Sequence, residues 1–440
     1  MYNFVCYKNL RLGDSLMKGV TFSSILIVLS TLVLSSPNVA QQTLKPTDNC
    51  RDHSASAIAA FADADLEEVV RNALSVDSGE DLTCALLSEL IRLTVPAESE
   101  RVVYGGTLRP LPSKPFENLD GIQNLTNLTT LSIINRLITD ISPISELTNL
   151  RVLNLHTNWF SDISPLIGLT NLEQLIISEN PISDISALRQ LTNLRQLHVH
   201  GMYPYQLQHY LNYKDGRDPD LVFNGITDIS PLAGLIQLRL LRIHLNTISD
   251  ISPLAGLTNL THLRLYDNQI TDIGALSELN NLILLWIHNN QIDDINALSD
   301  MPGMLQLSLN NNAISNIDAL SNMAELENLF LSNNKIGDIA PLRQLRNLQV
   351  LRLENNAIND ISSLGNLRNL KELSLAHNAS LYHVQPLLAN EGIGRGDELD
   401  LRFTYVRCSD MDALEDKGVT LLRVTALNGS ACAGRRLEDP

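Results

Sequence analysis

A single repeat length constrains this chain more than any other feature. From Leu128 to Leu375 the sequence repeats every 22 residues, in cycles that start at 128, 150, 172, 194, 216, 238, 260, 282, 304, 326, 348 and 370. One cycle reads Leu260-x-x-Leu263-x-Leu265-x-x-Asn268-x-Ile270-x-Asp272-Ile273-x-x-Leu276-x-x-Leu279. A fixed period of this size indicates a stack of equivalent supersecondary units rather than a compact globule.

Each cycle divides into two halves with different periodicity. The Leu263-x-Leu265 half alternates apolar and polar residues, which is typical of a half-buried strand. The half from Asp272 to Leu279 spaces its apolar residues by three, which favours a short 3₁₀ or extended turn over a long helix. Strands inside and thin turns outside predict a curved α/β solenoid with a parallel concave sheet and convex turns.

This pattern resembles the leucine-rich repeat family. The Asp-Ile-Ser-x-Leu variety with a 22-residue cycle is similar to internalins, to their bacterial relatives and to the phosphatase-1 regulatory subunit built of such repeats. The resemblance spans residues 106–391, including an irregular stretch at 202–223, and implies a leucine-rich repeat horseshoe that binds proteins. Two alternatives stay open: internalin-like glycan or cell-surface recognition, as in an adhesin, and a phosphatase-regulator-like scaffold.

Two polar ladders accompany the leucines. A buried Asn can satisfy backbone groups of its own and the neighbouring coil. The same position of the cycle is occupied by Asn158, Asn180, Asn224, Asn246, Asn268, Asn290, Asn312, Asn334, Asn356 and Asn378. An Asp before each outer turn is a good cap, and one stands at Asp140, Asp162, Asp184, Asp228, Asp250, Asp272, Asp294, Asp338 and Asp360. The alternative is a calcium ladder, although calcium usually needs several converging oxygens and each cycle supplies one carboxylate.

A solenoid exposes two open ends, which must be covered. Residues 56–105 are predicted to form a helical N-terminal cap, similar to the cap of bacterial members of the family. Apolar residues that include Phe61, Leu66 and Val70 define its first helix by their 3.6-residue spacing. A second short helix is expected near Thr83–Leu93, with Thr83 as its capping residue.

The repeat motif decays after Leu375, and residues 392–440 are predicted to form a separate C-terminal cap. This cap is expected to contain a strand at Glu398–Phe403, a short helix near Asp410–Glu415 and a further apolar segment at Val419–Val424. The cysteines fit the two caps, because Cys50 and Cys84 flank the first one whereas Cys408 and Cys432 lie in the second. Two local disulfides are the simplest of three pairings, and four free buried thiols are the alternative.

The N-terminus has the form of a secretory leader. Residues 1–40 contain Met17 and Lys18, an apolar run at Val20–Leu34 and a small residue, Ala40, before the expected cut, with Met17 as an alternative start. The competing interpretation is an uncleaved membrane anchor, for which the apolar core is rather short. We therefore expect an exported protein, secreted, periplasmic or on the cell surface, in which residues 41–55 form a polar tether.

The inner face of the predicted sheet collects aromatic, histidine and arginine side chains. Period-two alternation places the residues between the leucines there. Aromatic and Arg side chains are typical of binding hot spots, and the predicted partner-binding residues are His156, His200, Arg242, His244, Arg264, Tyr266, Trp286, His288, Phe330 and Arg352. The alternative is that these positions merely tolerate such residues and bind nothing.

The repeat pattern breaks from Met202 to Phe223, where either a repeat has degenerated or a loop was inserted. Tyr203 and Tyr205 lie in this stretch, and an aromatic loop on a rigid scaffold is expected to contact a partner. The alternative is an excursion that packs only against the chain itself.

No site for catalysis or for a metal stands out in the sequence. The chain lacks a Gly-x-Ser-x-Gly elbow, a His-Glu-x-x-His motif and a glycine loop that cradles phosphate. His198, His200 and His244 could in principle bind a metal, but no carboxylate occupies a matching position, so we expect no metal site there. We expect no cofactor, no enzymatic activity and no small-molecule substrate, but a monomeric scaffold that binds a protein or, alternatively, a glycan.

The formal net charge of −17 bears on the class of partner. A strongly acidic chain is repelled by nucleic acid and by anionic membrane surfaces. The same charge helps to keep a long repeat protein soluble. We therefore expect no nucleic-acid partner.

Overall fold

The computed structural model describes residues 41–95, 115–116, 118–202 and 225–422. The predicted leader, the tyrosines Tyr203 and Tyr205 and the cysteine Cys432 therefore lie outside the described residues. Residues from Gln42 onward belong to one compact unit. Within the described ranges, no helix is both long and apolar enough to span a lipid bilayer.

One parallel sheet runs through this unit, with its fourteen strands hydrogen-bonded in chain order. The leucines stay in register, so that Leu263 lies beside Leu241 on one side and Leu285 on the other. The strands are β1 (Arg92–Val95), β2 (Thr130–Ile133), β3 (Val152–Asn154), β4 (Gln174–Ile176), β5 (Gln196–His198), β6 (Leu240–Arg242), β7 (His262–Arg264), β8 (Leu284–Trp286), β9 (Gln306–Ser308), β10 (Asn328–Phe330), β11 (Val350–Arg352), β12 (Glu372–Ser374), β13 (Glu398–Asp400) and β14 (Thr420–Leu422).

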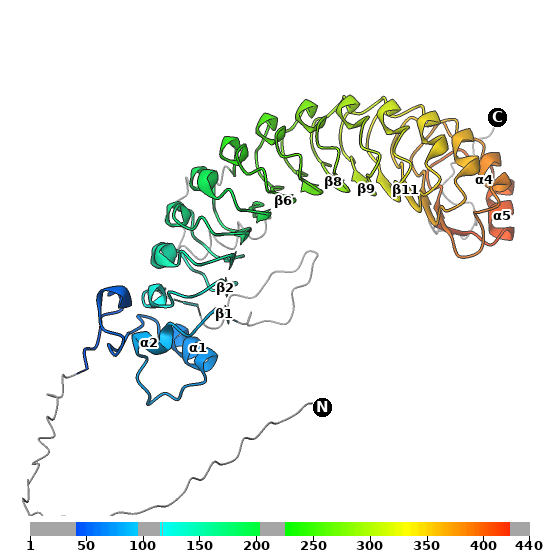
Figure 1. Cartoon of the computed structure of the whole chain (residues 1–440). Helices are drawn as coiled ribbons and strands as arrows, with labels where there is room; N and C mark the ends of the chain where they lie inside the picture. Colours follow the sequence, from blue (N-terminus) through cyan, green and yellow to red (C-terminus); the bar gives the residue numbers. More distant parts are fainter. Residues whose placement is uncertain (1–40, 96–114, 117, 203–224, 423–440) are drawn as a thin grey trace, which may run out of the picture. The chain divides into compact units, whose positions relative to one another are not determined.

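Short 3₁₀ turns line the side opposite the sheet, and the strands line the inner side of the arc (Figure 1). After η1 (Cys50–Asp52) in the cap, the turns are η2 (Ile122–Asn124), η3 (Ser142–Glu146), η4 (Ser164–Leu166), η5 (Ser186–Gln190), η6 (Ser230–Leu232), η7 (Ser252–Leu254), η8 (Gly274–Leu276), η9 (Asn296–Leu298), η10 (Asp318–Leu320), η11 (Ala340–Gln344) and η12 (Ser362–Asn366). A 3₁₀ turn is narrower than a helix, which lets each coil close within 22 residues. The predicted solenoid, a leucine-rich repeat horseshoe, is confirmed.

The core is a continuous apolar column between the sheet and the turns. In the cycle that starts at Leu260, the side chains of Leu263, Leu265, Ile270 and Leu276 are all fully buried. Equivalent residues of every described cycle join the same cluster. Each coil thus buries its apolar residues against both neighbours, which is why no coil folds alone.

The asparagine ladder forms hydrogen bonds between successive coils. The Asn334 amide donates to the carbonyls of Leu309 in the preceding coil and of Leu331 in its own coil, at 3.1 and 3.0 Å. Its oxygen accepts from the backbone N–H of Ile314 at 3.1 Å. The same pattern recurs along the stack, for example at Asn158 and Asn378. The predicted structural role is confirmed for the described members; Asn224 lies outside the described residues.

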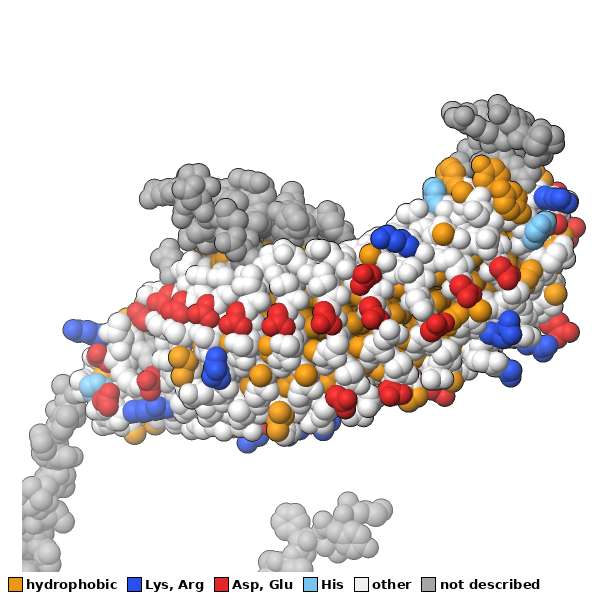
Figure 2. All heavy atoms as spheres, turned by 90° about the horizontal axis from the view of Figure 1, so that it is seen from above, with side chains coloured by type: hydrophobic (Ala, Val, Ile, Leu, Met, Phe, Trp, Pro, Cys, Tyr) orange, Lys and Arg blue, Asp and Glu red, His pale blue; other side chains and the backbone are white. Residues whose placement is uncertain are grey.

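The aspartate ladder caps the outer turns. The Asp140 carboxylate accepts from the backbone N–H of Ser142 at 2.8 Å, and the same bond recurs before η4 to η9, η11 and η12. Before η10, Asn316 accepts the equivalent bond from Asp318. These side chains are exposed, and acidic groups form a row along the outer side in Figure 2. The predicted capping role is confirmed.

Acid should weaken the stack through this ladder. The backbone N–H of each following serine lowers the pKa of Asp162, Asp228 and Asp250 below the usual 3.8. A carboxylate whose folded pKa is depressed contributes stability that is present above pH 3.8 and is lost as the pH falls through the folded value. We expect the melting temperature of the wild type to fall in that acidic range. The melting temperature of the triple variant Asp162→Asn, Asp228→Asn, Asp250→Asn should fall less over the same range.

Thermal melts across a pH series measure this effect. An Asn side chain keeps the capping bond without titrating, as Asn316 does. The variant should therefore melt somewhat lower near neutral pH, show a flatter acid slope, and approach the wild type in acid. Parallel acid slopes would contradict the assignment.

The N-terminal cap contains α1 (Ala64–Leu74) and α2 (Cys84–Leu87), with Asp63 and Thr83 capping their first turns through side-chain oxygens. The second helix is shorter than predicted. The helical prediction up to Leu93 was wrong, because Arg92–Val95 is the strand β1 and pairs with β2. Strand pairing with the first repeat, which a local pattern does not contain, decides the structure there.

The predicted polar tether is also corrected, because residues 42–55 are part of the cap. Leu44 is buried and its N–H donates to the carbonyl of Ile58 at 2.8 Å. Cys50 and Cys84 form the predicted disulfide, with their Cα atoms 5.4 Å apart. The disulfide joins this N-terminal segment to α2 and closes the end of the stack.

At the other end the sheet continues through the C-terminal cap, which is therefore not separate from it. β12 pairs with β13 and β13 pairs with β14, while α4 (Gln385–Ala389) and α5 (Cys408–Asp416) take the place of the outer turns. Cys408 is disulfide-bonded. Its predicted partner, Cys432, lies outside the described residues.

The strands on either side of the irregular stretch are neighbours in the sheet. β5 pairs directly with β6, so that Leu197 lies beside Leu241 and no strand stands between them. The N–H of Gly201 donates to the carbonyl of His244 at 3.0 Å. A Cβ on Gly201 would lie 1.8 Å from the carbonyl oxygen of Leu245, so only glycine fits where the chain leaves the repeat. Direct pairing of β5 with β6 favours an inserted loop over a degenerate repeat; residues 203–224 themselves lie outside the described residues.

Candidate functional site

A row of stacked rings crosses the inner face, and we call it the aromatic row. His200 stacks on His244 with ring centroids 4.2 Å apart, His244 on Tyr266 at 4.1 Å, and Tyr266 on His288 at 4.4 Å. His156 meets His200 edge-on at 6.0 Å. The row thus joins five rings from β3, β5, β6, β7 and β8, each of which follows the end of its strand.

The spacing of the sheet explains the stacking. Neighbouring strands lie about 4.8 Å apart, and equivalent positions of successive coils stay in register. Flat rings at one position therefore meet face to face at close to van der Waals distance. His200 and His244 become neighbours because β5 and β6 pair across the insertion.

Arginines pack on the larger aromatic residues beside the row. The guanidinium of Arg264 lies 4.1 Å from the ring centroid of Trp286, in a cation–π arrangement. Arg352 lies 5.9 Å from the ring centroid of Phe330 and donates to the Glu372 carboxylate at 2.7 Å. These residues end strands β7, β8, β10 and β11, as Arg242 ends β6. The ten predicted binding residues that the structure describes therefore lie on the same face, whereas Tyr203 and Tyr205 lie outside the described residues.

Burial differs from the sequence-based expectation at one predicted contact residue. His244 is only 3% exposed, because rings cover it on both sides. Its Nδ1 and the Nε1 of Trp286 are buried and have no hydrogen-bond partner among the residues that the structure describes. His244 supports its neighbours rather than offering an open contact surface, whereas Tyr266, Trp286 and His288 are partly exposed.

Four histidines of this face, His198, His200, His244 and His288, have a lowered pKa and are neutral at physiological pH. Burial, with the neighbouring Arg242 second, lowers the pKa of His198 to about 3. Burial, with His156 second, lowers the pKa of His200 to about 4. Burial also lowers the pKa of His244 and His288. The positive charge of the face therefore comes from its arginines.

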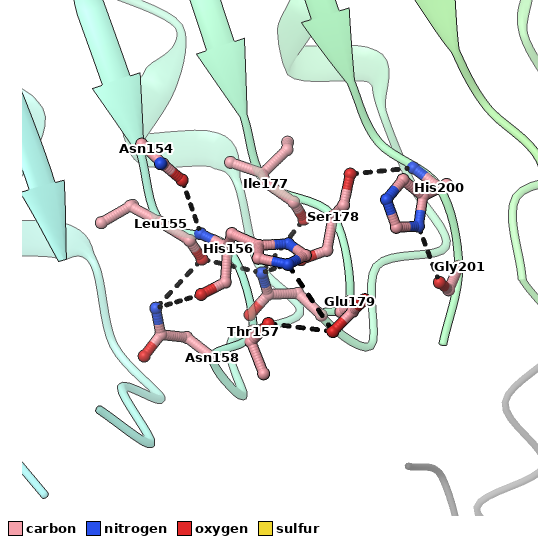
Figure 3. A network of polar contacts seen from close by, with 11 residues as sticks. Asn154, Leu155, His156, Thr157, Asn158, Ile177, Ser178, Glu179, His200 and Gly201 are labelled. Atoms are coloured by element: carbon pink, nitrogen blue, oxygen red, sulfur yellow. Dashed lines mark hydrogen bonds and ion pairs between the residues drawn. The ribbon is translucent and has the colours of Figure 1, made fainter. Parts of the chain in front are cut away.

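A second cluster lies at one end of the aromatic row. Nε2 of His156 lies 3.7 Å from Oε2 of Glu179, and one ligand atom from each of His156, Glu179 and His200 lies within 4.8 Å of the other two (Figure 3). The sequence had suggested a different trio, with His198 and His244 beside His200. The structure instead brings in a carboxylate, which the sequence analysis had judged to be missing.

Glu179 escaped the sequence analysis because of its backbone conformation. It has a φ of 58°, and most described coils carry a residue with positive φ at this position, usually an Asn or Asp. A residue with positive φ does not follow the alternation of side-chain directions in a strand. The alternating pattern therefore does not predict whether its side chain points to the inner face or to the core. A charged Glu among these short polar residues was the one available signal.

Comparisons with known proteins agree on the repeat. A family model described as leucine-rich repeats in two copies matches residues 126–168, 258–300, 304–344 and 346–383. A comparison with curated proteins gives no match. Among solved structures, a leucine-rich repeat protein of Leptospira interrogans is 19% identical with a TM-score of 0.53, over 70% of this chain and 88% of that chain. At this identity the likeness shows the fold alone.

Two structures from Listeria monocytogenes are also similar. The functional domain of InlJ, which includes a cysteine ladder, is 19% identical with a TM-score of 0.52, over 79% of this chain and 66% of that chain. An internalin, inlF, is 30% identical with a TM-score of 0.69, and the match covers 82% of this chain and 95% of the internalin. The chain therefore belongs to the internalin-like leucine-rich repeat proteins.

Proposed function

We propose that this chain is an exported, non-catalytic scaffold that binds a protein partner through its inner face. The contact surface comprises the exposed edges of the aromatic row, Trp286 and the flanking arginines. We also propose that Tyr203 and Tyr205, which lie outside the described residues, contact the partner. The leucine-rich repeat fold and the internalin-like neighbours support an interaction scaffold in general.

The observation that carries the proposal is the density of rigid aromatic and arginine side chains on consecutive strands. Tyr266, Trp286 and His288 are held by their neighbours, so little conformational entropy remains to be lost on binding. Arg264 packs on Trp286 and is likewise ordered. Aromatic and arginine anchors of this kind dominate binding energy at protein interfaces.

Ring packing favours a protein over a glycan as the partner. A sugar packs flat on an open aromatic face, and the rings of the row cover one another at 4.1–4.4 Å. Arg264 covers Trp286 in the same way. Tyr266, Trp286 and His288 remain partly exposed, and ring edges of this kind suit the uneven surface of a protein. Binding on a glycan array, lost in the variant described next, would reverse this choice.

Removing the centre of the surface should abolish capture of the partner. The double variant Tyr266→Ala, Trp286→Ala takes away two hot-spot side chains, and we expect affinity to fall by about 100-fold or more. The measurement is a quantitative pull-down from native extracellular or envelope material. A partner captured by the wild type should be lost from the variant.

Two controls separate this result from misfolding. Tyr382→Ala removes an exposed tyrosine from the C-terminal cap, so it should capture the same proteins as the wild type. Tyr266→Phe keeps the stacked ring and should retain most of the binding. If the double variant is folded and captures an unchanged set of proteins, the inner face is not the binding surface.

A further inference from the structure

We propose that His156, Glu179 and His200 form a binding site for a divalent transition-metal ion of the zinc type. The three residues come from the ends of strands β3, β4 and β5 and converge at one end of the aromatic row (Figure 3). Imidazole nitrogens and a carboxylate oxygen are ligands that zinc accepts in proteins. The inference goes beyond partner binding and does not depend on it.

His156 makes the hydrogen bond through Nδ1 that is usual for a metal-binding histidine. Nδ1 of His156 lies 3.1 Å from the carbonyl oxygen of Ser178. A carbonyl only accepts hydrogen bonds, so Nδ1 carries a proton and Nε2 is the ring atom that can bind a metal. Nε2 lies 3.7 Å from Oε2 of Glu179. A cation between these two atoms would be bound by both.

His200 has the same arrangement. Its Nδ1 lies 3.2 Å from the carbonyl oxygen of Gly201, so Nε2 is again the ring atom that can bind a metal. The ring is fixed from the other side by stacking on His244 at 4.2 Å. Metal-binding histidines almost always make such a bond through the second nitrogen, because it fixes the tautomer and the orientation of the ring.

Glu179 is held in place by the neighbouring coil. Its side chain is only 6% exposed, and the hydroxyl of Thr157 donates to Oε2 at 2.9 Å. The backbone φ of 58° turns the side chain toward the two histidines. A carboxylate ligand that is itself hydrogen-bonded is the usual second half of such a site.

The distances fit a zinc ion after a small closure. Zinc binds nitrogen and oxygen at about 2.0–2.2 Å, so two ligand atoms of a tetrahedral ion lie about 3.4 Å apart. His156 and Glu179 are at 3.7 Å, and no pair in the trio exceeds 4.8 Å. No fourth His, Cys, Asp or Glu joins this cluster in the described part of the chain. In a tetrahedral site, water or a group from a bound partner would supply the fourth ligand.

The test uses the full mature chain, treated with a chelator and then titrated with Zn²⁺ alone against a fluorescent competitor. We expect one Zn²⁺ per chain with micromolar or tighter affinity. Glu179→Gln and His200→Gln should each weaken binding by more than about 100-fold, because losing a ligand costs more than losing a supporting residue. Co²⁺ should give the visible absorption of a four-coordinate site in the wild type but not in the variants.

His383→Gln is the matched control, because it removes an exposed histidine of the C-terminal cap. It should bind Zn²⁺ like the wild type. Glu179→Gln preserves size and an acceptor for Thr157, and its melting temperature verifies folding. Absence of one-to-one binding in the wild type, or binding by folded Glu179→Gln with unchanged affinity, would overturn the proposal. Either result leaves open whether the inner face binds a protein.

Discussion

Replacing Asn334 with alanine should lower the free energy of unfolding by about 3–5 kcal/mol, because several buried backbone groups lose their partner at once. The Asn334 amide donates to the carbonyls of Leu309 and Leu331, and its oxygen accepts from the N–H of Ile314. The side chain is 9% exposed, so water reaches these groups poorly. Each buried group left unpaired costs about 1–3 kcal/mol.

Chemical denaturation followed by circular dichroism measures this loss. Asn347→Ala is the matched control, because Asn347 is an exposed asparagine whose amide makes one hydrogen bond among the described residues, to Glu325 at 3.3 Å. That variant should stay within about 0.5 kcal/mol of the wild type. Equal stability of the two variants would mean that the ladder contributes nothing to coil stacking.

The double variant Cys50→Ala, Cys84→Ala should lose about 3–4 kcal/mol at the N-terminal end of the stack. The disulfide closes a loop with a sequence separation of 34 residues, and removing it restores the corresponding entropy to the unfolded chain. The released segment also carries Leu44, which packs with Ala57 and Cys84 in a small separate cluster. The loss should therefore be concentrated in the cap.

Hydrogen exchange resolved by peptide separates the cap from the repeats. Residues 42–95 should exchange faster in the variant, whereas β6 to β11 should keep their protection. Adding a reductant to the wild type should reproduce the change in the cap, and adding it to the variant should produce no further change there. A uniform loss of protection over all repeats would contradict a local role for the disulfide.

Periodicity was sufficient to predict the scaffold. The leucines at 263, 265 and 276 recur at fixed positions, so their burial follows from the stacking of equal coils. The roles of Asn334 and Asp140 also follow, because a buried amide and a pre-turn carboxylate each have one obvious use in a narrow coil. These predictions depend only on relations within a cycle or between adjacent cycles.

The sequence did not predict contacts between residues that are more than one cycle apart. His200 and His244 stand two cycles apart in the sequence, yet they stack because β5 and β6 pair directly. The continuity of the aromatic row therefore depended on whether 202–223 was a repeat or an insertion. Glu179 was missed for a related reason, since its side-chain direction is set by a positive φ and not by strand alternation. β1 was missed because its partner, β2, lies beyond the cap.

The direct pairing of β5 with β6 separates residues that stabilise the stack from residues that can vary in sequence. The bonds beside this pairing, from Val199 to Arg242, from Gly201 to His244 and from Ile226 to Asn246, use only atoms on either side of the insertion. Changes in length or composition between them leave these bonds in place. We therefore expect the inserted segment to change during evolution with little effect on the stability of the stack. The same pairing gives protein engineers a graft point at which foreign peptides can be displayed beside a rigid surface.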